Sequence, residues 1–406
     1  MQNHIVCIAS EFKGNEVLEE AKKAGWRVSL VTREDYKDSN WTWDCLSDFV
    51  TVAKTATSDD YIRAATNFAG KYPIRRIIGV DEFDVLTAAR AREHLQIEGM
   101  SNSHALRFRD KLRMRIVADA AGIPCPDFVG CFNPEDINAY LEKVEFPVII
   151  KPRTEVSAFG IRKCENAAQV WDTLNELDSR HTWRDHPSQY QIEKFIEGNV
   201  YHVDSVIHGG AVVAVGVSKY GTTPLNVSHR GGVFTSSIVD YKSKERRELE
   251  GLNRKLLKAF EHKHGVSHAE FLESEEDGKF YLLEVACRVG GAYIANVLEQ
   301  ACGFNLWSEW GKLSIETDEE PYIPPKTRKE YAGITLALAN QKCPDTSHYG
   351  AEEIVYRVNK PKHVGLIFRS KSRERVQELM NEYSSRITED FLQIAPTKER
   401  HDDHYR

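Results

Sequence analysis

The first hundred residues alternate short apolar runs with amphipathic stretches. Runs of strand length and stretches with helical spacing follow one another as HIVCIAS, GNEVLEEAKKAG, WRVSLVT, RRIIGVD and FDVLTAARAREHL. Such alternation predicts a parallel sheet covered by helices. Asp81 and Glu82 come at the end of a predicted strand, where open α/β sheets place ligand-binding groups. A helix N-cap is the alternative role for these two residues.

The rest of the chain changes from mixed patterns to strand-dominated ones. A helical pattern, DKLRMRIVADAAG, runs to Pro124 and Pro126, which stop it. A small α+β unit follows, and from about residue 190 onward strand patterns dominate. A last segment, roughly 325–395, combines strands with the amphipathic helix SRERVQELMNEYSS.

One expected hairpin carries two acidic residues where core residues would be expected. Residues 268–291 read HAEFLESEEDGKFYLLEVACRVGG, with the turn centred on Asp277. That register places Glu270 opposite Glu284 on one face, with Cβ atoms roughly 5 Å apart. Like charges so placed repel, and a divalent cation such as Mg²⁺ would remove the conflict. The alternative is an exposed hairpin whose repulsion is screened by solvent.

Further candidate chemistry lies at the ends of predicted elements. Lys111 begins a helix and Lys151 ends an apolar strand, although a solvated lysine is the alternative for each. Ser157 and Gly160 lie in a turn whose backbone amides could cover phosphates, or in an ordinary hairpin turn. Arg288 precedes two glycines, an arrangement suited to a carboxylate or a phosphate, or to a surface turn.

Composition narrows the class of protein. The chain has 406 residues with a formal net charge of −7 and a pI near 6.1, which argues against nucleic acid as the main partner. No apolar stretch is long enough to span a membrane, and the N-terminus lacks the pattern of a secretory signal. Eight scattered cysteines without zinc spacing indicate reduced thiols and a cytoplasmic protein.

The order of these signals resembles that of ATP-grasp enzymes. A lysine, a strand-ending lysine, a small-residue loop, E-K-F-I-x-G and a Glu…Glu-x₃-Arg-x-Gly-Gly hairpin follow one another between about Arg107 and Ile294. The chain is similar in particular to carboxylate–amine ligases, a group that includes L-amino acid ligases and carnosine-synthase-like and biotin-carboxylase-like proteins.

The resemblance implies a fold of the α/β and α+β class with four domains. An N-terminal, Rossmann-like pre-ATP-grasp domain would span residues 1–105, although no G-x-G-x-x-G follows its first strand. The central or lid subdomain would span 106–190. The subdomain with the metal and acyl-phosphate sites would span 191–320, and a C-terminal α+β appendage would span 321–406.

The resemblance also implies roles for the nucleotide-binding residues. Lys111 and Lys151 would contact the ATP phosphates, and the loop with Ser157 and Gly160 would close over them. The adenine would lie against the segment formed by Glu193, Lys194, Phe195 and Ile196. The Glu193 side chain or the Lys194 carbonyl would accept a hydrogen bond from the exocyclic amine, and the Ile196 N–H would donate one to the ring.

The remaining roles concern the metal, the ribose and the substrates. Glu270 and Glu284 would hold Mg²⁺, with Mn²⁺ as the alternative metal, and Arg288 would hold the substrate carboxylate and then the acyl phosphate. His202 or Asp204 would replace the ribose-binding acid, because Asn199 and Val200 stand at its usual place. The candidate substrate residues are His229, Gly290, Gly291 and Asp81, with His229 and Asp81 as candidates for deprotonating the amine.

Two departures from the family pattern bear on these roles. Ala286 stands where many relatives have an asparagine ligand, which puts a second metal in doubt. The expected phosphate loop is poor in glycine, with Phe159 before Gly160, which puts its flexibility in doubt.

The expected activity is an ADP-forming ligase for a small-molecule carboxylate and an amine. The carboxylate would attack the γ-phosphate to give an acyl phosphate, and the amine would displace phosphate to form a peptide-like amide bond. A small-molecule kinase and a nucleotide-binding pseudoenzyme are the alternatives. Neither nucleic acid nor membrane is an expected partner, and a homodimer is the expected assembly by resemblance.

Overall fold

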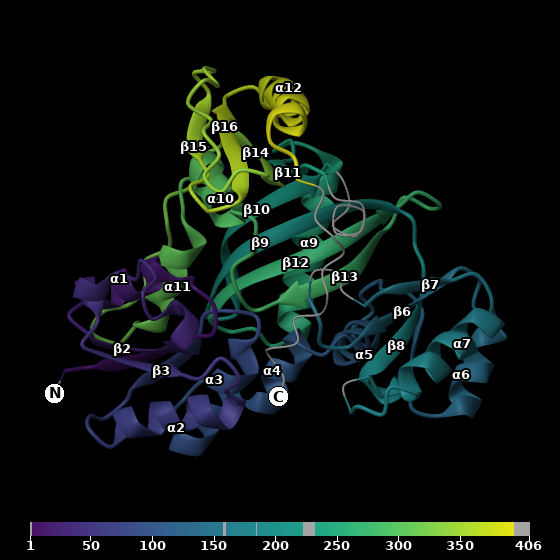
Figure 1. Ribbon diagram of the computed structural model, residues 1–406, viewed down its shortest axis with the longest axis horizontal. Helices are drawn as coiled ribbons and strands as arrows, with labels where there is room; N and C mark the ends of the chain where they lie inside the picture. Colours follow the sequence, from purple (N-terminus) through teal and green to yellow (C-terminus); the bar gives the residue numbers. More distant parts are fainter. Residues whose placement is uncertain (1, 157–159, 184, 222–231, 394–406) are drawn as a thin grey trace.

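A computed structural model describes residues 2–156, 160–183, 185–221 and 232–393. Its strands form three sheets, two of four strands and one of eight (Figure 1). Helices pack against all three sheets. No helix among the described residues combines the length and apolar composition that a bilayer crossing requires.

The N-terminal sheet is parallel, as the alternating pattern predicts, with strand order β3-β2-β1-β4. All six residues of β1 are buried because helices cover both faces of a parallel sheet. The strands are β1 (His4–Ala9), β2 (Arg27–Arg33), β3 (Asp48–Val52) and β4 (Arg76–Gly79). The helices are α1 (Asn15–Lys23), α2 (Ser58–Ala69) and α3 (Asp84–Leu95), with the short 3₁₀ helices η1 (Glu34–Tyr36) and η2 (Trp43–Cys45).

The second four-stranded sheet is antiparallel, with order β5-β8-β6-β7. Its strands are β5 (Phe128–Gly130), β6 (Val148–Pro152), β7 (Arg162–Cys164) and β8 (Tyr190–Lys194). The helices of this region are α4 (Asn102–Ala105), η3 (Leu106–Phe108), α5 (Lys111–Ala120), α6 (Pro134–Leu141), α7 (Ala167–Asp178) and η4 (Pro187–Gln189). The expected boundary at 190 falls at the start of β8, which completes this sheet. The bounds of the four domains stay predictions.

The large sheet has the order β13-β12-β9-β10-β11-β14-β16-β15, and its last three strands come from the expected C-terminal appendage. Hydrogen bonding between β11 and β14 joins that segment to the rest of the sheet. The strands are β9 (Gly198–His208), β10 (Ala211–Tyr220), β11 (Phe234–Ile238), β12 (Gly265–Ser274), β13 (Phe280–Ala286), β14 (Tyr331–Leu338), β15 (Ile354–Arg357) and β16 (His363–Ser370). The helices are α9 (Lys244–Ala259), α10 (Ile294–Cys302), α11 (Leu306–Ser314) and α12 (Arg373–Asp390).

The register of the β12–β13 hairpin confirms the predicted pairing of its two acidic residues. Glu270 lies directly opposite Glu284. A register shift follows immediately, so that Phe271 pairs with Leu282. Such an irregularity re-aims side chains next to it, and it is not visible in the spacing of apolar residues.

One apolar core joins the N-terminal sheet to the large sheet. It contains residues of β1, α1 and β2 together with residues of α10 and α11. Leu298, on α10, is fully buried in this core. A Cβ at Gly216 on β10 would lie 2.0 Å from Leu298 Cδ2, so α10 packs directly on the backbone of the sheet.

We expect Leu298→Ala to lower the free energy of unfolding by about 2–5 kcal/mol, because it leaves a cavity in a fully buried position. Urea denaturation followed by tryptophan fluorescence measures this loss. Ile323→Ala is the control: Ile323 is 80% exposed, so its change should stay within about 0.5 kcal/mol. Equal effects of the two substitutions would contradict the packing described here.

Candidate active site

A cleft of about 750 Å³ is lined by residues of the small antiparallel sheet, the large sheet and the end of β4. It brings together most of the site residues expected from the sequence: Asp81, Lys111, Lys151, Glu193, Lys194, Phe195, Ile196, Glu270, Glu284, Arg288 and Gly291. These residues come from segments more than two hundred positions apart, so the fold gathers them into one site.

Two buried lysines reach the cleft from different elements. Lys111 is the first residue of α5, whose N-cap Asp110 accepts from two backbone amides of the first turn. Its Nζ donates to Glu155 O at 2.6 Å and lies 3.2 Å from Glu284 Oε1. Lys151 lies near the end of β6, with Nζ 2.7 Å from Glu193 Oε2. Burial lowers the pKa of Lys151 to about 8, although Glu193 acts in the opposite direction.

Glu193 is committed to an ion-pair network. Its Oε1 lies 2.8 Å from Arg115 Nε, and its Oε2 pairs with Lys151. Burial alone would raise the pKa of Glu193, but Arg115 and Lys151 hold it below its usual value. The carboxylate is therefore engaged by cations, which disfavours its predicted role as acceptor for the adenine amine. Of the two predicted acceptors, the Lys194 carbonyl is the better candidate.

The segment after Glu193 forms part of the cleft wall. The Lys194 amide donates to Asp127 O at 2.9 Å, and the Phe195 amide donates to Pro147 O at 3.0 Å. These two bonds fix the backbone where β8 ends. Ile196 follows at the point where the chain leaves the strand and also lines the cleft. This segment therefore lines the cleft, and its adenine contacts stay a prediction.

The paired carboxylates fit a divalent cation. Glu270 and Glu284 face one cleft from neighbouring strands, and both offer the oxygen ligands that Mg²⁺ prefers. Cationic or donor groups offset part of their repulsion: Lys111 contacts Glu284, and His268 Nε2 lies 3.4 Å from Glu270 Oε1. Burial would raise the pKa of Glu270, but the hydrogen bond from His268 keeps it below its usual value.

Arg288 is held in place by Glu82, a contact that the sequence pattern does not predict. Arg288 Nε donates to Glu82 Oε2 at 2.5 Å, and Arg109 Nη1 donates to Glu82 Oε1 at 2.5 Å. Burial opposes ionisation of Glu82, but the two guanidinium groups prevail and lower its pKa to about 2. The position of Glu82 at the end of β4 was the only available signal for this role.

The remaining expected substrate residues differ in their surroundings. Asp81 lines the cleft and forms an ion pair with Lys13. Gly291 also lines the cleft, whereas Gly290 packs against the interior. A Cβ at Gly290 would lie 2.8 Å from His268 Nδ1, so the close approach of that ring requires a glycine. Packing therefore explains Gly290 better than substrate contact.

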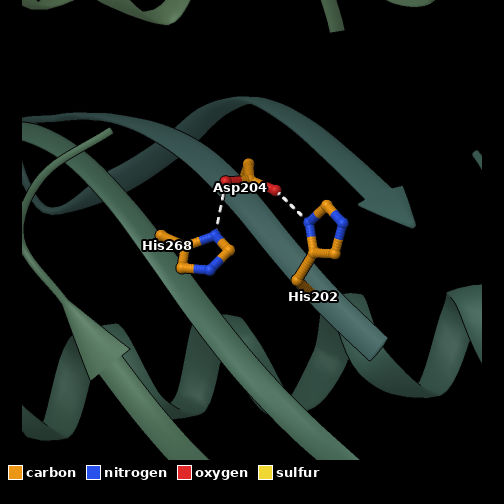
Figure 2. Close-up of side chains that lie close together, drawn as sticks. All are labelled: His202, Asp204 and His268. Carbon is orange, nitrogen blue, oxygen red and sulfur yellow. Dashed lines mark hydrogen bonds and ion pairs between the residues drawn. The ribbon is translucent and has the colours of Figure 1, made fainter. Parts of the chain in front are cut away.

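The predicted ribose contact by His202 is wrong. His202 is 1% exposed and is not among the residues that line the cleft. Its Nδ1 lies 2.5 Å from Asp204 Oδ2, and its Nε2 lies 2.7 Å from Ser236 Oγ. The alternative, Asp204, is fully buried as well. Both residues belong to an internal network (Figure 2), and sequence spacing could not distinguish this from a ligand site.

Of the last three expected residues, one belongs to the described part of the chain. Ser157 and His229 lie outside the described residues. Gly160 has φ of +71°, a left-handed conformation that favours glycine, and a Cβ there would lie 2.9 Å from Pro152 Cγ. The structure therefore explains Gly160 by backbone conformation.

Part of the chain matches a known domain family, and most of it is similar in sequence to a known ligase. Residues 144–296 match the family model of the ATP-grasp domain. The L-arginine-specific L-amino acid ligase of Bacillus subtilis is 26% identical over 305 residues, which cover 73% of this chain and 71% of that protein.

Solved structures confirm the predicted fold. An L-amino acid ligase from Bacillus licheniformis superimposes with a TM-score of 0.74 at 15% identity, covering 97% of this chain and 99% of that one. N5-carboxyaminoimidazole synthetase from Staphylococcus aureus, complexed with ADP, gives 0.71 at 13% identity and covers 95% and 98%. Together with the match to the domain model, these likenesses show that the chain contains an ATP-grasp domain and has the ATP-grasp fold.

Proposed function

We propose that this chain is an ATP-dependent, ADP-forming ligase that joins an amino acid or another small carboxylate to an amine. The similar proteins named as amino acid ligases support the class of reaction. One observation carries the proposal: the paired carboxylates Glu270 and Glu284 share a cleft with Arg288 and with both buried lysines. A site that activates a carboxylate with ATP needs all three kinds of group.

In the first step, a carboxylate oxygen of the substrate attacks the γ-phosphorus, and the bond to the β–γ bridging oxygen breaks to release ADP. Lys111 and Lys151 attract the phosphates and spread the charge that develops on the transferred group. Glu270 and Glu284 would hold Mg²⁺, which neutralises phosphate charge when it is bound. Ala286 contributes no ligand atom, so the proposal requires one metal.

In the second step, the amine nitrogen attacks the acyl carbon, the carbon–oxygen bond to phosphate breaks, and the amine loses a proton. We assign Arg288 the task of holding the carboxylate and then the acyl phosphate, and its fixed orientation through the Nε contact with Glu82 supports this role. Asp81 lines the same cleft, and we propose it as a contact for the amine substrate. A cytoplasmic location and a homodimer stay predictions.

Product analysis tests the reaction class. We expect release of ADP and inorganic phosphate that requires both a carboxylate substrate and an amine, measured with pairs of amino acids and simple amines. The amide product should appear in equal amount to the phosphate. A stable phosphorylated product would indicate a kinase instead, and nucleotide binding without turnover across the whole panel would indicate a pseudoenzyme.

We expect Glu284→Gln to lower kcat by about 100-fold or more, because it removes one of two charged metal ligands. The melting temperature should stay nearly unchanged or rise, because the substitution also removes a like-charge pair. Glu276→Gln, in the exposed turn of the same hairpin, is the matched control and should keep full activity. A large loss of stability in Glu284→Gln would instead indicate a structural role.

The pKa of Lys151 predicts how nucleotide affinity varies with pH. Its folded-state pKa lies near 8, so the charge that attracts phosphate is present below that pH and is lost above it. We expect ATP affinity to fall as pH rises through 8, approaching about tenfold per pH unit. Binding near pH 8 should also take up a proton, because the phosphates favour charged Lys151.

Calorimetry in buffers of different ionisation enthalpy measures both the affinity and the proton uptake. Lys151→Arg keeps its charge throughout this range, so its affinity should depend less on pH. The same pH dependence in Lys151→Arg would assign the titration to another group.

A further inference from the structure

Three buried polar side chains, His202, Asp204 and His268, form a cluster (Figure 2). His268 connects this cluster to the proposed metal ligand Glu270. Strands β9 and β12 are neighbours in the large sheet, with Asp204 opposite His268 and His202 opposite Glu270. Alternate residues of a strand share a face, so all four side chains project from the same side of the sheet. The sheet therefore places the cluster and Glu270 in one row.

The contacts in the cluster fix the orientation of the His268 ring. Asp204 Oδ1 lies 2.8 Å from His268 Nδ1, and Asp204 Oδ2 lies 2.5 Å from His202 Nδ1. Asp204 thus holds one nitrogen of each ring. Because Nδ1 of His268 faces Asp204, its other nitrogen, Nε2, is directed to Glu270 at 3.4 Å.

Glu270 is contacted at one oxygen by two donors. The Tyr220 hydroxyl donates to Oε1 at 2.8 Å, and His268 Nε2 faces the same oxygen. Tyr220 is itself fixed against His202, with ring centroids 4.7 Å apart. Both contacts go to Oε1, which leaves Oε2 as the oxygen that a cation in the cleft would meet.

The turn after Arg288 is shaped around the same ring. A Cβ at Gly290 would lie 2.8 Å from His268 Nδ1 and 3.2 Å from Asp204 Oδ1. A larger residue would therefore displace His268 or the turn that carries Arg288. Burying polar groups costs folding free energy unless each of them is paired, and apolar residues could fill the same space without that cost. The buried cluster therefore indicates a role beyond filling space.

We propose that His268, together with Tyr220, is a positioning residue that holds Glu270 Oε1 and so presents Oε2 to the divalent cation. The proposal rests on the metal-binding role proposed above for Glu270. It assigns Asp204 and His202 the task of fixing the His268 ring. Outer contacts of this kind typically change metal affinity or activity by about 10–100-fold when they are removed.

Two substitutions of His268 separate positioning from simple packing. The amide nitrogen of His268→Gln reaches about as far as Nε2 and keeps a donor for Glu270. That of His268→Asn reaches about as far as Nδ1 and keeps only the contact with Asp204. The quantity to measure is the ratio of ADP affinity with Mg²⁺ to ADP affinity without it, obtained by calorimetry.

We expect His268→Asn to lower this ratio by about tenfold or more, His268→Gln to lower it less, and both to leave metal-free ADP affinity unchanged. His208→Asn is the matched control, because His208 forms a histidine–carboxylate pair with Glu316 at 2.7 Å outside the cleft. Its ratio should equal that of the wild type.

Three results would overturn the proposal. An unchanged ratio in His268→Asn would reject it while leaving the metal site in place, and equal losses in both His268 variants would indicate packing alone. A wild-type ratio of one would reject the metal role of Glu270 as well. If His268→Asn does not fold, Tyr220→Phe decides, since it removes the other donor to Oε1: a lowered ratio supports the proposal and an unchanged one rejects it.

Discussion

Two carboxylates held face to face on neighbouring strands are the constraint around which the cleft is organised. Glu270 and Glu284 would repel each other in an isolated hairpin, and the protein surrounds them with groups that offset this repulsion. Lys111 contacts one carboxylate, and Tyr220 and His268 contact the other. These contacts offset the repulsion between the two carboxylates, and both side chains still face the cleft.

Buried ion pairs extend this organisation to the borders between the sheets. Arg115 pairs with Glu193 on the small sheet and also donates to Leu283 O on the large sheet at 2.8 Å. Glu82, at the end of the N-terminal sheet, pairs with Arg288 beyond β13. Removing one partner from such a pair is destabilising, because it leaves an uncompensated buried charge. Each pair therefore links the position of a site residue to the packing of one sheet against another.

The predictable part of the site consists of residues whose role depends on local geometry. The period of two along β12 and β13, with a polar turn between them, was enough to pair Glu270 with Glu284. The position of Lys151 in the cleft could be predicted because three aliphatic residues before it indicate a strand that runs into the interior. The error at His202 has the same origin, since alternation places a side chain on a face but does not say whether that face meets a cleft or a core.

The sequence by itself determined the parallel N-terminal sheet and the acidic hairpin, because each follows from the alternation of apolar and polar residues within its own segment. The order of the family's motifs can also be read directly along the chain. Tertiary structure alone decided that β14, β15 and β16 extend the large sheet, that Glu82 holds Arg288, and that Asp204 orients His268. These contacts join positions separated by tens to hundreds of residues. Their partners are chosen by how the sheets pack, which no local pattern of apolar and polar positions records.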